Sequence, residues 1–140
     1  MNNKNKNSIF YMKKQVYEQI VQYCKEEAPI EACGLVSGVD NKGFSFWPVP
    51  NEDKSPVRFT ISDDSMMKTI KKIEIKREQL TGVFHSHPIT RAYPSFYDVK
   101  NYSYPSIAYI IVSLLKSEPA VNCFRITENK KVIKLKLELI

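Results

Sequence analysis

The most apolar stretch of the chain is Ile107-Ala108-Tyr109-Ile110-Ile111-Val112. A short run of this kind, without polar interruption, is typical of a strand that is buried on both faces of a sheet. Such a central strand requires neighbouring strands on both sides and helices that cover the two faces. The segments before and after it have the patterns expected of both.

Six further stretches predict strands, and most of them are short apolar runs near Gly, Pro or Asn. They are Cys33–Val39, Phe44–Val49, Arg58–Ile61, Leu80–Phe84, Val121–Ile126 and Val132–Ile140. The last two flank an Asn129-Lys130 turn. In the final stretch apolar residues alternate with Lys134, Lys136 and Glu138, so one face of that strand is expected to contact water.

Two segments have the apolar periodicity of helices. The first spans Lys13–Glu27, where apolar residues recur at every fourth position until Pro29 ends the pattern. The second starts after the N-cap candidate Ser62 and runs to about Arg77. We therefore predict an α/β (α+β) fold, a mixed β-sheet flanked by two main helices. It is expected to form a single domain at residues 9–140, preceded by a disordered N-terminus at residues 1–8.

The composition excludes several broad classes of protein. The chain has 140 residues, of which 43% are hydrophobic and 26% charged, close to the average of soluble globular domains. It contains no apolar run long enough to span a membrane and no signal-peptide core, so we expect a cytoplasmic protein without a membrane partner. The cysteines Cys24, Cys33 and Cys123 show no C-x-x-C spacing, so reduced and buried thiols are expected.

The net charge of +6 would suit an acidic partner, but the positive residues are spread along the chain. The densest run falls in the second predicted helix and lacks interleaved aromatic residues of the kind that stack on bases. It consists of Lys71, Lys72, Lys76 and Arg77. We interpret this run as a solvated helix face, and we expect no specific nucleic-acid partner.

The chain has two histidines, His85 and His87, and they directly follow the predicted Leu80–Phe84 strand. Residues i and i+2 of a strand point to the same face, so both imidazoles can converge on one point. Pro88 ends the strand and fixes the pair at its mouth. Imidazole is the commonest metal ligand, and two imidazoles on a rigid backbone suit zinc. The alternative interpretation is a pair of ordinary histidines at a strand end.

Asp98 follows in a segment that also predicts a helix start. Ser95 as N-cap with Asp98 three positions later matches a capping box, which explains both residues without a metal. The two interpretations are compatible, because a helix that begins at Ser95 holds Asp98 in its first turn. A catalytic zinc takes three protein ligands and leaves its fourth position to water. The side chains of His85, His87 and Asp98 supply that number.

A zinc-bound water also needs a base that takes its proton and passes it to a leaving amine. Spacing does not choose among four candidates, which are Glu26, Glu27, Glu31 and Asp63. Glu31 has one local distinction, because it lies between the end of the first predicted helix and the next strand, where it could point inward from a rigid element. The alternative is a solvated carboxylate at this helix–strand junction.

One motif spans His85-Ser86-His87-Pro88 and Pro94-Ser95-Phe96-Tyr97-Asp98. It resembles the H-[ST]-H-P…S-x-x-D core of the JAMM (MPN+, JAB-type) zinc metalloproteases. The upstream segment Pro29-Ile30-Glu31-Ala32-Cys33-Gly34-Leu35, with Gly38, resembles the P-x-E-x-C-G-L…G segment of that family. Asn51 and the Arg58–Ile61 run are similar to its N…F stretch. The resemblance covers roughly residues 9–126, and the compact length is typical of small prokaryotic or phage-type members.

The resemblance implies the cytidine-deaminase-like architecture of JAB/MPN domains and a role for each motif residue. His85, His87 and Asp98 would bind Zn2+. Glu31 would be the general base and acid on the zinc-bound water, and Ser95 would help to stabilise the oxyanion. The implied activity is that of a zinc metallopeptidase, a JAMM-type isopeptidase. Its implied substrate is a peptide or isopeptide bond at the C-terminal glycine of a ubiquitin-like or sulfur-carrier protein that ends in Gly-Gly.

From the sequence alone, other functions stay open. A non-catalytic MPN-type protein-binding module would be expected to have a disrupted ligand set, whereas no motif position is missing here. A thiol enzyme would pair Cys33 with His85 or His87, but Cys33 opens an apolar run that predicts a buried, unreactive thiol. Nucleic-acid binding through the net charge would be nonspecific and sensitive to salt. The H-x-E…P-C-x-x-C signature of zinc deaminases and the H-E-x-x-H motif are absent.

Overall fold

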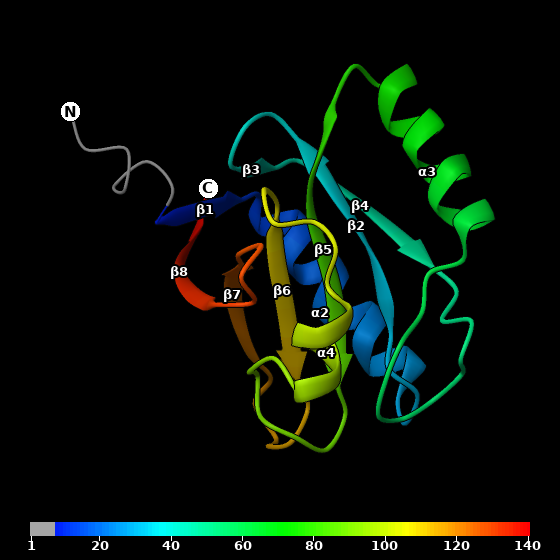
Figure 1. Cartoon of the computed structure of the whole chain (residues 1–140), viewed down its shortest axis with the longest axis vertical. Helices are drawn as coiled ribbons and strands as arrows, with labels where there is room; N and C mark the ends of the chain where they lie inside the picture. The colour runs from blue at the N-terminus through cyan, green and yellow to red at the C-terminus, as the bar shows by residue number, and fades with distance from the viewer. Residues whose placement is uncertain (1–7) are drawn as a thin grey trace.

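The computed structural model describes residues 8–140, which form one mixed sheet with helices on both faces (Figure 1). Within this range the eight strands follow the order β3-β1-β8-β7-β6-β5-β2-β4. The strands are β1 (Ile9–Met12), β2 (Cys33–Gly38), β3 (Lys42–Gly43), β4 (Ser45–Val49), β5 (Gln79–His87), β6 (Ala108–Ser113), β7 (Ala120–Ile126) and β8 (Val132–Leu139). The helices are α2 (Lys14–Glu27), α3 (Asp63–Ile75) and the short α4 (Phe96–Asn101). The predicted α/β fold with a mixed sheet and two main helices is confirmed, while residues 1–7 of the predicted disordered N-terminus lie outside the described residues.

The predicted central strand is β6, and all of its residues are buried. It pairs in parallel with β5 and antiparallel with β7. Parallel neighbours cannot be joined by a hairpin, so the chain between β5 and β6 crosses over one face of the sheet. The helix α4 forms within this crossover. The crossover therefore brings α4 onto the sheet near the carboxyl end of β5.

The sheet separates two apolar cores. On one face, Ile20 of α2 packs in a cluster with Phe84 and Ile110. On the other face, Ile73 of α3 belongs to a cluster that includes Val83. Successive strand residues point to opposite faces, which is why Val83 and Phe84 belong to different clusters. His85 and His87, which follow Val83 at two-residue spacing in β5, therefore share the face that α3 and α4 cover.

Both helix starts predicted from side-chain capping form. Ser62 Oγ accepts a hydrogen bond from the Ser65 amide at 3.1 Å, and Ser95 Oγ accepts one from the Asp98 amide at 3.0 Å. The Asp98 carboxylate accepts in return from the Ser95 amide at 2.9 Å, which completes a capping box. A cap of this kind stabilises a helix by about 1 kcal/mol. It holds Asp98 in the first turn of α4, with its side chain buried.

The segment Arg58–Ile61 is not a strand, which corrects the prediction from its apolar residues. Its backbone bonds to a side chain instead of to a neighbouring strand. Asn51 Nδ2 donates to the Arg58 carbonyl at 3.0 Å, and the Thr60 amide donates to Asn51 Oδ1 at 3.1 Å. The strands β1 and β3, which the sequence does not predict, pair with each other, and β1 also pairs with β8.

The alternation predicted for β8 holds only in its middle. Leu135 is buried in the cluster that α2 covers, whereas Ile133 and Leu139 are each 41% exposed. The two exposed residues belong to neither apolar cluster within the described part of the chain. Near both ends of β8, apolar residues as well as charged residues therefore contact water.

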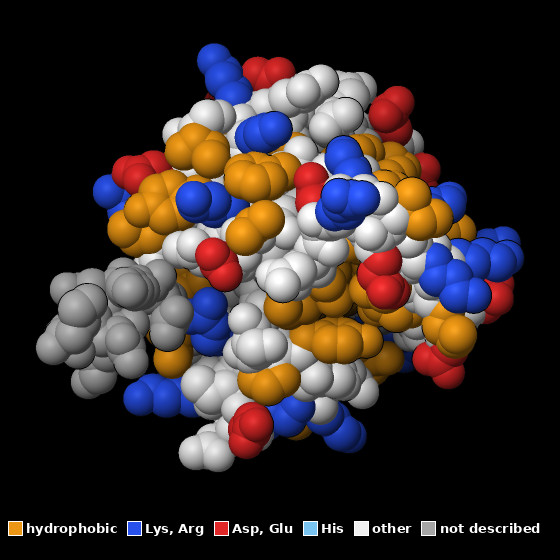
Figure 2. Space-filling model, turned by 90° about the horizontal axis from the view of Figure 1, so that it is seen from above, with side chains coloured by type: hydrophobic (Ala, Val, Ile, Leu, Met, Phe, Trp, Pro, Cys, Tyr) orange, Lys and Arg blue, Asp and Glu red, His pale blue; other side chains and the backbone are white. Residues whose placement is uncertain are grey.

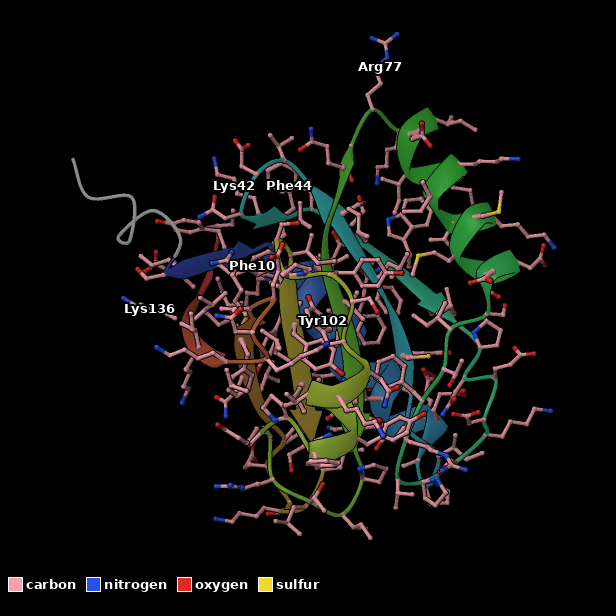
Figure 3. All side chains as sticks on the ribbon, viewed as in Figure 1. Phe10, Lys42, Phe44, Arg77, Tyr102 and Lys136 are labelled. Atoms are coloured by element: carbon pink, nitrogen blue, oxygen red, sulfur yellow. The ribbon has the colours of Figure 1, made fainter. Side chains whose placement is uncertain are left out.

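The two ends of β5 differ in chemistry. Arg77, just before β5, projects into solvent (Figure 3), whereas both histidines lie at the opposite end of the strand.

The face seen in Figure 2 has Lys and Arg side chains interspersed with Asp and Glu, and apolar side chains lie between them. No helix within residues 8–140 is long and apolar enough to cross a membrane.

Candidate metal centre

The strand β5 carries both histidines at its carboxyl end. It continues through His87, beyond the predicted Leu80–Phe84, because the chain keeps pairing with β6 until Pro88. The side chains of His85 and His87 share one face, and their Nε2 atoms lie 2.9 Å apart. Both residues are buried, with exposures of 0% and 3%. The pair is thus part of the sheet rather than a mobile strand end.

The third group comes from α4. Asp98 Oδ2 lies 3.2 Å from His85 Nε2 and 3.0 Å from His87 Nε2. Within residues 8–140, these buried side chains form the one group of at least three His, Cys, Asp or Glu residues that could hold a metal ion. Their possible ligand atoms all lie within 4.8 Å of one another. The structure therefore brings together the three side chains that the sequence predicts as metal ligands.

The two imidazoles are held in different ways. His87 Nδ1 lies 2.8 Å from the Arg91 carbonyl oxygen. A carbonyl only accepts, so Nδ1 carries a hydrogen and Nε2 is the ring nitrogen that faces the cluster. His85 is held by ring contacts, with the Phe59 ring stacked at 4.6 Å and the Tyr109 ring at 5.0 Å between centroids. Among the described residues, His85 Nδ1 is a buried atom without a hydrogen-bond partner.

This donor set fits zinc. Two imidazole nitrogens and one carboxylate oxygen form a three-ligand set that leaves one tetrahedral position open. Ligand atoms at about 2.0–2.1 Å from a tetrahedral zinc lie about 3.3 Å from one another. The three separations here are 2.9, 3.0 and 3.2 Å. Such a close approach of two ring nitrogens and an anionic oxygen is favourable when positive charge, from a proton or a metal ion, lies among them.

The cluster stabilises the ionised form of Asp98. Burial alone would raise the pKa of this carboxyl group, but His85, His87 and the Ser95 amide hold it well below its ordinary value. Burial lowers the pKa of His85. Burial acts in the same direction on the pKa of His87, but the bonds to Asp98 and Arg91 outweigh it and raise that pKa. An ionised carboxylate beside a neutral imidazole is the state in which these groups bind a cation.

Glu31 is the one of the four candidate acids that the structure brings to this cluster. The Ala32 amide donates to Ser86 Oγ at 2.8 Å, and the Ser86 amide donates to the Ala32 carbonyl at 3.0 Å. These bonds extend the β2–β5 register, so Glu31 lies opposite His87. Its side chain is buried, and the residue is 3% exposed. The other three candidates are exposed, namely Glu26, Glu27 and Asp63.

The carboxyl group of Glu31 has the environment of a proton carrier. Burial raises its pKa from 4.5 to about 8, while His87 lowers it and Asp98 raises it further. Its Oε1 atom is buried and has no hydrogen-bond partner among the described residues. A group that exchanges protons near neutral pH needs a pKa close to that pH. Glu31 meets this condition better than an exposed carboxylate would.

Ser95 and Cys33 differ in what they can contribute. Ser95 Oγ accepts from the Asp98 amide, which leaves its O–H hydrogen to donate to another group. Cys33 Sγ donates to the carbonyls of Val49 and Pro50 at 3.6 and 3.7 Å. Burial raises the pKa of the Cys33 thiol to about 12. A nucleophilic cysteine needs a thiolate, so the thiol-enzyme alternative has no support.

A cavity of about 230 Å³ opens beside Asp98 between α3, α4 and the 59–61 segment. Tyr102 lies in front of β5 and β6 next to α4 (Figure 3), and it forms part of the lining. The aromatic part of the lining consists of Phe59, Tyr97, Tyr102, Tyr104 and Tyr109. Sequence reasoning missed these walls, because they come from three separate segments whose proximity depends on the fold.

The family model described as prokaryotic homologs of the JAB domain matches residues 13–127. The chain belongs to this family. The resemblance seen in the His-Ser-His-Pro and Ser-x-x-Asp motifs is thereby confirmed. The JAB-domain protein described here also has the mixed sheet with covering helices that this resemblance implies.

Named relatives of this JAB-domain protein are hydrolases. The CysO-cysteine peptidase of Mycobacterium tuberculosis is 27% identical over 107 residues, which cover 75% of this chain and 73% of that protein. The desampylase of Pyrococcus furiosus is 23% identical over 123 residues, which cover 88% and 86%. The solution structure of a Desulfitobacterium hafniense protein matches with a TM-score of 0.86 and 28% identity, over 94% of this chain and 92% of that one.

Proposed function

We propose that this JAB-domain protein is a zinc-dependent hydrolase of peptide or isopeptide bonds at the C-terminal glycine of a ubiquitin-like or sulfur-carrier protein. The observation that carries the proposal is the approach of His85 Nε2, His87 Nε2 and Asp98 Oδ2 to within 3.2 Å of one another. The buried carboxyl group of Glu31 beside them supplies a base. Relatives named as a peptidase and a desampylase support the reaction class.

His85, His87 and Asp98 would hold the zinc ion. When bound, the ion would acidify a water molecule and polarise the carbonyl of the scissile bond. The chain contributes the orientation of the donors. His87 presents Nε2 because its Nδ1–H donates to the Arg91 carbonyl, and the Ser95 amide donates to the Asp98 carboxylate. These contacts fix the ligand atoms before any ion arrives, which favours affinity.

Glu31 would carry the proton of the reaction. It takes a proton from the attacking water while the water oxygen forms a bond to the carbonyl carbon. The same proton then passes to the nitrogen of the leaving amine as the C–N bond breaks, and Glu31 returns to its ionised form. One water is consumed, and the products are a carboxylate terminus and an ammonium group, because the second proton of the water passes to the released amine. A pKa of about 8 for the buried Glu31 suits both transfers.

Ser95 would assist at the carbonyl oxygen. Its O–H donates to that oxygen as negative charge develops there. Its lone pair continues to cap α4, because Oγ accepts from the Asp98 amide at 3.0 Å. One side chain would thus position the ligand Asp98 and stabilise the transition state.

The test compares wild type with Glu31→Gln on a panel of small carrier proteins that end in Gly-Gly, each fused to a reporter. The substituted amide would keep the size of the side chain but could not accept a proton, so we expect kcat/KM to fall at least about 100-fold. Zinc content and the circular dichroism spectrum should not change. The matched control is Glu26→Gln, at an exposed position, which should retain wild-type activity. Chelation should abolish cleavage, and added zinc should restore it.

Two results would count against this function. Full turnover by the chelated protein or by the Glu31→Gln variant would contradict the mechanism. Bound zinc and carrier binding without cleavage of any panel member would favour the non-catalytic MPN-type module instead.

A further inference from the structure

We infer that Asn51 is a positioning residue, which fixes the backbone of Glu31 and the ring of Phe59 against the metal centre. The inference rests on the proposed function for its catalytic meaning. It goes beyond that function because Asn51 contacts neither the predicted ligands nor the reacting atoms.

The amide group of Asn51 makes four hydrogen bonds. Nδ2 donates to the carbonyls of Glu31 and Arg58, each at 3.0 Å. Oδ1 accepts from the amides of Asp53 and Thr60 at 3.0 and 3.1 Å. The residue is 7% exposed, and each nitrogen and oxygen of the amide has two partners of the matching kind. No other side chain of similar size could satisfy all four backbone groups.

The segment that Asn51 closes holds Glu31 at both of its backbone groups. The Glu31 amide donates to the Ser55 carbonyl at 2.9 Å, and the Glu31 carbonyl accepts from Asn51. The Glu31 side chain has a buried Oε1 without a partner among the described residues. Since no hydrogen bond from the described residues holds that oxygen, its position follows from the backbone of Glu31, to which Asn51 supplies one of these two bonds.

The same amide also fixes Phe59. The Arg58 carbonyl and the Thr60 amide, on either side of Phe59, both bond to Asn51. The Phe59 ring stacks on His85 at 4.6 Å with an angle of 25° between the planes. His85 Nδ1 has no hydrogen-bond partner in the described part of the chain, so ring contacts orient this imidazole. Asn51 therefore contacts the backbone of Glu31 through one hydrogen bond, and it acts on His85 through the Phe59 ring.

Two substitutions distinguish the donating nitrogen of the amide from its accepting oxygen. Asn51→Asp keeps an oxygen that accepts from the Asp53 and Thr60 amides but removes the donor to the Glu31 and Arg58 carbonyls. Asn51→Ala removes all four bonds. The matched control is Asn41→Ala, which loses a similar bond, from Nδ2 to the Ile9 carbonyl at 2.9 Å, in the turn before β3.

We expect kcat on the cleavable Gly-Gly fusion to fall 10- to 100-fold in both Asn51 variants, with KM within about twofold of wild type, because displaced reacting groups slow the chemistry rather than binding. Independently of turnover, the imidazole NMR signals of His85 should shift in the zinc-loaded and the chelated protein, since the Phe59 ring above it moves. Asn41→Ala should leave kcat and the His85 signals unchanged.

Folded Asn51→Asp with wild-type kcat and unmoved His85 signals would overturn the inference. So would a failure of both Asn51 variants to fold, because it would assign Asn51 a purely structural role. If wild type cleaves no fusion, the proposed function fails, whereas shifted His85 signals in Asn51→Asp would still support the positioning of that ring. The two failures are therefore distinguishable.

Discussion

At the scale of single residues, one oxygen atom organises the candidate metal centre. Asp98 Oδ2 accepts from the Ser95 amide at 2.9 Å and lies within 3.2 Å of Nε2 of both His85 and His87. The capping box of Asp98 is confirmed, and the same geometry is compatible with its prediction as a metal ligand. The helix cap orients the carboxylate, and this preorganisation favours cation binding.

Glu31 should make the metal-free protein less stable as the pH rises. Its pKa is about 8 in the folded protein, against an ordinary value of 4.5. Between these pH values the unfolded chain releases a proton that the folded chain keeps. The stabilisation is therefore complete below pH 4.5 and is lost as the pH rises toward 8. The difference between the two pKa values corresponds to a loss of at most about 5 kcal/mol in the free energy of unfolding. We expect a measured loss of about 2–3 kcal/mol.

Urea unfolding of the chelated protein at about pH 5 and about pH 8 measures this effect. Glu31→Gln stays neutral at both pH values, so it should gain at least about 2 kcal/mol relative to wild type at the higher pH. Glu26→Gln should follow wild type at both. A difference between wild type and Glu31→Gln that does not change with pH would contradict the raised pKa.

The three side chains of the candidate metal centre could be picked out from local sequence rules, whereas the contacts of the residues around them could not. His85 and His87 have same-face spacing, and Asp98 stands in a recognisable cap, so local rules place all three. The approach of Glu31 to His87 depends on the β2–β5 register, which spacing does not reveal. Asn51 is marked in the sequence by its similarity to the N…F stretch of the family, but its hydrogen bonds are not, since one of its partners is a carbonyl 20 residues away.

At the scale of elements, the crossover between β5 and β6 is anchored where it leaves the sheet. Ser113 of β6 and Asn122 of β7 donate to the carbonyls of Thr90 and Ala92, at 2.5 and 3.0 Å. With the bond from His87 to the carbonyl between them, three consecutive carbonyls are tied to three strands. The chain that leads into α4 is therefore fixed, and α4 is placed over the histidines.

The substitution Gly34→Ala should weaken the packing of β2. A Cβ at Gly34 would collide with the Phe84 ring and the Trp47 carbonyl oxygen. Overpacking of this kind costs about 1–3 kcal/mol, and we expect a loss of about 2 kcal/mol in the free energy of unfolding in urea. The control Gly82→Ala meets first the flexible end of Ile110, at 3.2 Å, and should cost less than about 1 kcal/mol. Equal losses in both variants would contradict this explanation.

The elements with long or strongly apolar patterns could be predicted, and the short ones could not. The most apolar run forms β6, and α2 begins one residue from its predicted start. The Arg58–Ile61 run fails as a strand because a buried side chain, Asn51, satisfies its backbone. The strands β1 and β3 have four and two residues, which are too few to show a period.

At the scale of the whole molecule, the centre lies between two layers. His85 and His87 belong to the sheet, whereas Asp98 belongs to the helix that crosses the face opposite α2 (Figure 1). Charges of both signs lie between apolar atoms on the face of Figure 2, and no histidine is visible there, in agreement with the burial of both. The three predicted ligands can be brought together only when the crossover has packed on the sheet.

Zinc should therefore stabilise the folded protein, because the unfolded chain does not hold the three donors together. At 100 times Kd the gain is about 2.7 kcal/mol, which raises the Tm of a domain of this size by about 10 °C. Asp98→Asn should reduce the shift to less than about 3 °C, measured by calorimetry with and without zinc. The control Asp64→Asn, at an exposed acid 3.1 Å from Lys68, should keep the full shift. An equal shift in Asp98→Asn would place the zinc elsewhere.

The division of the donors between β5 and the six-residue α4 also bears on how fast an ion could exchange with solution. Short helices open locally at a lower free-energy cost than the central strands of a sheet. Detachment of α4 would withdraw Asp98 and leave both imidazoles in place. The residence time of an ion would then follow the opening rate of one small helix, while the rest of the domain stayed folded.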